Sequence, residues 1–112
     1  MALNQVSLGT LTSATAGTSA KPEDSNAAFQ RGGAVLAIIQ PTNGAFVGTA
    51  KIQGTNDLDS VADGDASWTD LLSFVAPAAN SGSKQAVVTA MRRMRLNVTA
   101  FTSGSVGGLL VA

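Results

Sequence analysis

The sequence predicts an all-β protein, a small antiparallel β-sandwich or jelly-roll-like domain that follows an extended, loop-like N-terminal segment. Short strand-like segments recur at roughly ten-residue spacing with turn residues between them, which is typical of sandwiches. No segment repeats its apolar residues with the 3.6-residue period of a helix. A chain of 112 residues suits one domain. We expect the N-terminal arm and loop at 1–30 and the sandwich at 31–112.

The first third of the chain divides into two parts. Residues 3–11, "LNQVSLGTL", alternate weakly and predict an edge strand or an extended arm. Residues 12–27, "TSATAGTSAKPEDSNA", are rich in Thr, Ser, Ala and Gly and show neither the helical nor the strand period. Such a long segment cannot bury enough apolar surface to order itself. We therefore expect it to be a loop that is mobile in the isolated protein and ordered by a partner.

The middle of the chain predicts two strands. Residues 34–40, "AVLAIIQ", are apolar on both faces, which suits a central strand covered on each side. Residues 41–44, "PTNG", predict a turn. Residues 45–54, "AFVGTAKIQG", follow as a strand with Phe46, Ala50 and Ile52 on one face.

The remaining segments complete the sandwich. An acidic loop at 55–67 precedes a short strand at 68–75, "WTDLLSFV". A turn-rich connection leads to a strand at 84–91, "KQAVVTAM", and residues 105–112 form the last strand.

Three arginines fall within four positions of the segment 91–108, "MRRMRLNVTAFTSGSVGG". With a period of two, one face holds Met94, Leu96, Val98 and Ala100, and the other holds Arg93, Arg95, Asn97 and Thr99. The apolar set belongs in the core, so the second set is expected to face outward. Strict alternation would bury Arg92, which is costly without a partner. We therefore expect a bulge or a strand break near 91–93.

Charge is segregated along the chain. Five of the seven acidic residues lie between 57 and 70, and four of the seven basic residues lie between 84 and 95. Opposite patches favour docking of one on the other, within the chain or between chains. The residues we assign to a partner interface are Arg93, Arg95, Asp57 and Asp59.

Composition argues against several classes of function. The chain has no cysteine and no histidine, so thiolate chemistry and the commonest general base are absent. Its formal net charge of zero gives no general attraction to nucleic acid or anionic membranes. The longest apolar run is too short to span a bilayer, and the first residues lack the pattern of a secretory signal. We expect neither an enzyme nor a cofactor.

The acidic loop raises one alternative, a calcium site with Asp59, Asp63 and Asp65 as ligands. Its spacing does not match the twelve-residue calcium loop, and the final Glu is missing. A carbohydrate-binding module is a related alternative, but the chain has one Trp and no Tyr to form a sugar platform.

Three segments together show a resemblance to a known class of protein. They are "KIQGTND" at 51–57, "WTDLLSF" at 68–74 and "MRRMRLNVTAFTSGSVGGLLV" at 91–111. This pattern resembles small structural proteins of tailed bacteriophages, in which a Trp-x-x-Leu strand and an Arg-aromatic-x-Arg strand precede a Thr-Ser-Gly turn. Here Met94 stands in place of the aromatic residue, and the loop between the first two segments is longer.

The resemblance covers about half the chain and implies a β-sandwich virion protein. The role it implies first is a capsid decoration, or cement, protein on the exterior of the head. Such a protein would be made in the bacterial cytoplasm, form a homo-oligomer and dock on the major capsid protein. A tail or head–tail adaptor component stays open beside it.

Overall fold

The computed structural model describes residues 4–112, which form an almost entirely β structure. The elements are β1 (Gln5–Leu11), α1 (Pro22–Ser25), β2 (Ala34–Thr55), β3 (Thr69–Ala76), β4 (Lys84–Thr89) and β5 (Arg93–Val111). All strand pairs are antiparallel. The predicted all-β class is therefore confirmed.

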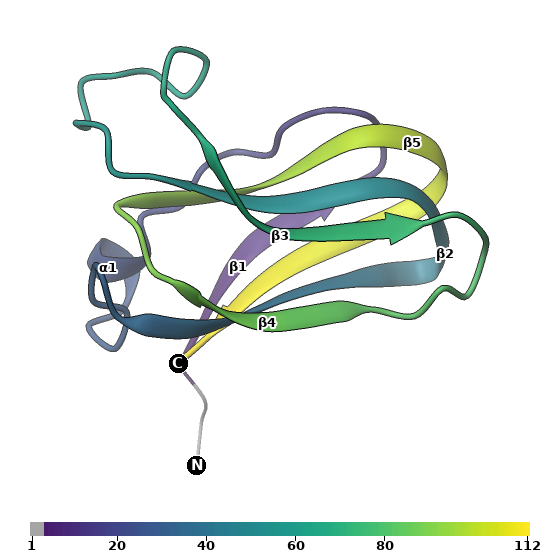
Figure 1. Cartoon of the computed structure of the whole chain (residues 1–112), viewed down its shortest axis with the longest axis horizontal. Coiled ribbons are helices and arrows are strands. Elements are labelled where there is room, and N and C mark those ends of the chain that lie inside the picture. The colour runs from purple at the N-terminus through teal and green to yellow at the C-terminus, as the bar shows by residue number, and fades with distance from the viewer. Residues whose placement is uncertain (1–3) are drawn as a thin grey trace.

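The long strands β2 and β5 form one two-stranded ribbon that folds back over itself (Figure 1). Pairing runs from Leu36↔Val111 to Thr42↔Ser105, shifts register at the bend, and continues to Thr55↔Arg93. Gly104 makes the fold possible. It has a φ of +84°, and a Cβ there would lie 1.5 Å from the carbonyl oxygen of Ala45. Only glycine tolerates this approach.

The bend corrects two expectations. Residues 41–44 do not form a turn between separate strands, because β2 continues through them and keeps its pairing with β5 on either side. Likewise, residues 105–111 are the second half of β5 and not a separate strand. The turn residues at 41–44 therefore mark a bend shared by two paired strands.

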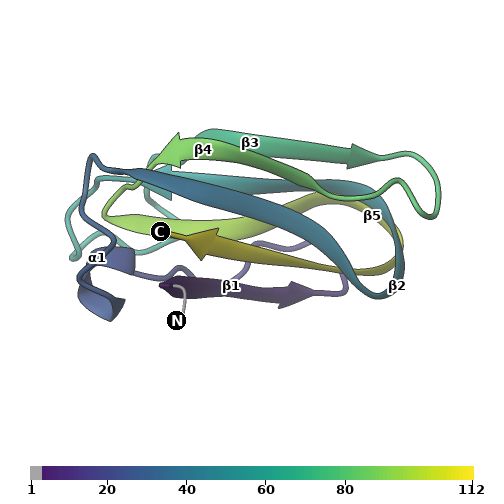
Figure 2. The same cartoon turned by 90° about the horizontal axis from the view of Figure 1, so that it is seen from below.

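Folding of this ribbon creates two layers. The first layer has the order β4, β2 (34–42), β5 (105–111) and β1. The second has the order β3, β2 (47–55), β5 (93–103) and the segment 15–20, which we call the strap. Figure 2 looks onto the outer side of the first layer. β2 and β5 run through both layers, and short connections lead from β1 to the strap and from β3 to β4. This is jelly-roll connectivity.

The strap and β1 tie the N-terminal segment to the sheet. Backbone hydrogen bonds join Gly17 N to Leu96 O at 2.7 Å and Ala20 N to Met94 O at 2.8 Å. The strap therefore has a partner within the same molecule, β5, and needs no second chain to form these hydrogen bonds. The mobility expected for residues 12–27 in the isolated protein stays a prediction. Since β1 also pairs with β5, the boundary drawn at residue 30 runs through a single sheet.

The core lies between the layers. Met94, Leu96 and Val98 are buried, as the alternation predicted, and so are Phe46, Ala50 and Ile52 from β2. Ala100 was expected in the core but is exposed. A register shift between Thr49 and Ala50 leaves one residue of β5 without a partner, which moves Ala100 off the inward side. The predicted strand break near 91–93 is present, because β4 ends at Thr89 and β5 begins at Arg93.

Candidate functional site

Arg93 lies on the outer side of the second layer, but it is not exposed. The loop between β2 and β3 (residues 56–68) folds over it, and the residue is only 4% exposed. Its Nη1 donates to the backbone oxygen of Val61 and to Asp63 Oδ1, both at 2.8 Å. The expectation of an accessible Arg93 is wrong, because the acidic loop of the same chain covers this guanidinium. Only its Nη1 is hydrogen-bonded; Nε and Nη2 are buried without a partner among the described residues.

Arg95 is partly exposed at the edge of the same loop. Its guanidinium carbon lies 4.1 Å from the centre of the Trp68 ring, which places a cation over an aromatic face. Its Nε donates to Gln53 Oε1 at 2.9 Å. Partial burial of Arg95 lowers the pKa of its guanidinium from the usual value, because burial disfavours the charged form.

A polar ladder continues from Arg95 across the second layer. Gln53 Nε2 donates to Asp70 Oδ1 at 2.8 Å, and Lys51 Nζ donates to Asp70 Oδ2 at 2.8 Å. These bonds hold the pKa of Asp70 below its ordinary value of 3.8, chiefly through Lys51 and then Gln53. The outer side of the second layer is therefore a charged, hydrogen-bonded surface made by three strands.

Asp63 joins three parts of the chain. Besides Arg93, it accepts hydrogen bonds from the backbone N of Ser19 at 3.3 Å and from Ser19 Oγ at 2.9 Å. The backbone oxygen of Asp63 also accepts from Trp68 Nε1 at 2.8 Å. Sequence analysis did not identify this junction, because Ser19 and Asp63 are 44 residues apart and only the folded ribbon brings them together.

The other loop aspartates have separate roles. Asp57 Oδ2 accepts from the backbone N of Ser67 at 2.7 Å, which closes the base of the loop. Asp59 forms ion pairs with Lys21 at 3.5 Å and Arg92 at 3.7 Å. Residues 4–112 contain no group of three or more His, Cys, Asp or Glu side chains close enough to hold a metal, so Asp59, Asp63 and Asp65 are not gathered at one site.

The outer side of the first layer contrasts with this charged surface. Val35, Ala37 and Ile39 of β2 face the core, so Leu36 and Ile38 point outward. Cross-strand pairing places Leu36 between Val87 and Val111, and places Ile38 beside Leu109. We call these five side chains the aliphatic face: Leu36, Ile38, Val87, Leu109 and Val111.

The surroundings of the aliphatic face are polar but uncharged. The polar outward strand positions next to it are Gln5 and Ser7 of β1, Gln40 of β2, and Gln85 and Thr89 of β4; Ala34 of β2 is also outward and uncharged. Val87 is 70% exposed. No Asp, Glu, Lys or Arg occupies an outward position on the strands of the first layer. Almost all of the chain's charge therefore lies elsewhere.

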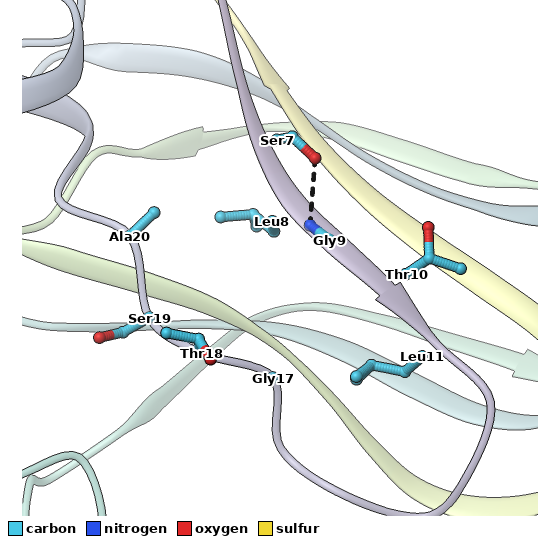
Figure 3. Close-up of a pocket in the computed structure, with 9 residues that line it drawn as sticks. All are labelled: Ser7, Leu8, Gly9, Thr10, Leu11, Gly17, Thr18, Ser19 and Ala20. Atoms are coloured by element: carbon cyan, nitrogen blue, oxygen red, sulfur yellow. Dashed lines mark hydrogen bonds between the residues drawn. The ribbon is translucent and has the colours of Figure 1, made fainter.

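A groove runs along the edge where the two layers separate, between β1 and the strap (Figure 3). Residues 7–11 and 17–20 line it, and none of them is charged. The hydroxyls of its two serines already have partners, since Ser7 Oγ accepts from Gly9 N and Ser19 Oγ donates to Asp63.

Comparison with protein-family models, with curated proteins and with solved structures found no match to this chain. Residues 4–112 contain no helix that is long enough and apolar enough to span a bilayer.

Proposed function

We propose that this protein is a structural component of a bacteriophage virion, and specifically a capsid decoration (cement) protein. In this role it docks on the shell of the major capsid protein and stabilises it on the exterior of the head. The resemblance of the segments at 51–57, 68–74 and 91–111 supports the phage assignment. The distribution of charge and apolar surface in the folded chain supports a role in assembly.

The observation on which this proposal rests is the aliphatic face. Soluble proteins that work alone keep their surfaces charged and free of large apolar patches. Here most of the charged side chains lie on the second layer and the loop, while the outward positions of the first-layer strands form an uncharged, aliphatic surface. Such a surface favours a protein that works packed against other protein subunits.

A tail or head–tail adaptor protein would share this observation, so it stands as the second candidate. A calcium-binding or carbohydrate-binding module has less support. Two of the three candidate ligands already have partners: Asp63 bonds to Arg93 and Ser19, and Asp59 pairs with Lys21 and Arg92. The Trp68 ring, the one candidate for a sugar platform, has the Arg95 guanidinium stacked on it.

Cosedimentation with shells tests the proposal. Capsids of the phage that encodes the protein, assembled without it, are mixed with increasing amounts of the purified chain. We expect saturable cosedimentation and a higher melting midpoint for the decorated shell. A chain that stays in the supernatant at every concentration, and binds purified tails instead, would transfer the assignment to the tail.

A further inference from the structure

The first half of β2 has the sequence of a strand that is buried on both faces, but the single chain buries only one of them. Residues 34–40 are apolar at nearly every position, which is the composition of a strand buried on both faces. Val35, Ala37 and Ile39 are covered by the second layer. Leu36 and Ile38 point to the opposite side, where Figure 2 shows no other element of residues 4–112 lying across the strands.

The uncovered side chains are contiguous. Val87, Leu36 and Val111 are direct cross-strand neighbours on β4, β2 and β5, and Ile38 and Leu109 form the next pair along the ribbon. Leu36, Ile38, Leu109 and Val111 are only partly buried, and they are separate from the hydrophobic cluster between the layers. Removing such a contiguous apolar patch from water is favourable, because the hydrophobic effect grows with the apolar area buried.

We propose that the aliphatic face is a self-association interface, on which the same face of a second copy of this chain packs. The absence of charge on the aliphatic face and its rim is the reason for choosing this partner. A charged surface placed on the face would lose its hydration without gaining a counter-charge. The occupant must therefore be uncharged too, and among the surfaces of residues 4–112 the outer side of the first layer has that property over a whole layer.

The rim of the face is suited to its own copy. The glutamine amides at positions 5, 40 and 85 and the hydroxyls of Ser7 and Thr89 both donate and accept hydrogen bonds. Such groups can pair across a two-fold axis without bringing like charges together. The four strands of this layer lie side by side (Figure 2), so the aliphatic face and its polar rim form one continuous surface.

The other free surfaces fit a second copy less well. The free edge of β1 has a bulge between Ser7 and Gly9, and bulges discourage strand addition at an edge. The outer side of the second layer bears Lys51, Asp70 and Arg95, whose partners lie in the same chain. Contact between copies is therefore expected on the first layer.

Two matched substitutions test this interface. Val87 on the aliphatic face and Val75 on the outer side of the second layer are 70% and 64% exposed, so Lys is accommodated at either position without opening the core. Sedimentation velocity over a concentration series gives the dimerisation constant of each variant. Wild type is expected to dimerise within this series.

Val87→Lys places two ammonium groups in one interface, so its dimerisation should weaken at least about tenfold. Val75→Lys should dimerise like wild type. A wild-type chain that stays monomeric throughout the series overturns the proposal, and so does equal weakening by the two substitutions. Cosedimentation of Val87→Lys with shells separates this inference from the decoration role: a variant that has lost dimerisation but still binds shells leaves that role intact.

Discussion

At the scale of single residues, Arg93 and Arg95 lie on the same side of β5 but in different surroundings. Arg93 and Arg95 both face outward from β5, as the alternation predicted, because Met94 and Leu96 face the core. The 56–68 loop covers Arg93 and stops short of Arg95, which stacks on Trp68 at the loop's end. A period of two predicts the side of the strand, but it cannot predict which residue a distant loop covers.

Because their surroundings differ, substitution by alanine should have different effects at the two arginines. Arg93→Ala leaves Asp63 without its cation next to a buried site, which should lower the free energy of unfolding by about 2–4 kcal/mol. Arg95→Ala removes a partly exposed stacking contact worth up to about 1 kcal/mol. Urea denaturation of both variants measures the difference.

We also expect Arg95→Ala, and not Arg93→Ala, to weaken binding to shells and to reduce the salt dependence of that binding, because Arg95 is the accessible guanidinium. Equal loss of stability in the two variants, with unchanged shell binding in both, would show that neither arginine has the role assigned to it.

Asp70 predicts a small acid-sensitive contribution to stability. Its pKa in the folded chain lies below the ordinary 3.8, so the stabilisation is complete above that value and is lost as the pH falls through the folded pKa. The carboxylate is partly exposed, so the effect should stay under about 1 kcal/mol. Thermal unfolding of Asp70→Asn and wild type should converge as the pH falls below about 4. A constant gap down to the lowest pH would contradict this account of Asp70.

At the scale of elements, the sequence predicted segments better than their connections. The strands at 68–75 and 84–91 match β3 and β4 within two residues, because alternation and turn residues are local signals. The continuity of β2 through 41–44 was missed, since it depends on pairing with β5 some sixty residues later. The junction of the strap, the loop and β5 at Asp63 was missed for the same reason, because it too joins residues that are distant in the sequence. The apolar pattern of 34–40 was the local signal for the aliphatic face.

The register of β5 can be tested at two positions. Leu96 is fully buried, so Leu96→Ala should lower the free energy of unfolding by about 2–4 kcal/mol. Thr99 is exposed, so Thr99→Ala should change it little. Chemical denaturation of both variants is sufficient, and comparable losses would mean that the register of β5 is wrong.

The strap should depend on Asp63. Asp63→Ala removes the acceptor of both Ser19 hydrogen bonds, whereas the amides of Gly17 and Ala20 bond directly to β5. We expect faster hydrogen exchange at Ser19, with a smaller increase at its neighbours, because the strap then opens locally. Asp65→Ala, in the same loop, serves as the control. Unprotected amides throughout the strap of the wild type would instead support the original expectation of a mobile segment.

At the scale of the whole molecule, the two layers divide polar and apolar surface between them. The second layer and its loop hold an internally paired network of charges, and the first layer presents the aliphatic face. In a face-to-face pair of copies, the two second layers would point in opposite directions, so that each pair displays Arg95 and Trp68 on both of its outer sides. The central claim is that another protein molecule covers the first layer in the working state.

Side-chain footprinting by a diffusible carbene tests that claim most directly, because it labels exposed aliphatic groups and reports each peptide separately. The chain is labelled when dilute, when concentrated and when bound to shells. The account predicts that labelling of the peptides containing Val87 and Leu36 falls several-fold on assembly, while that of Val75, of similar exposure in the single chain, stays constant. Labelling of Val87 that is the same in all three states would contradict it.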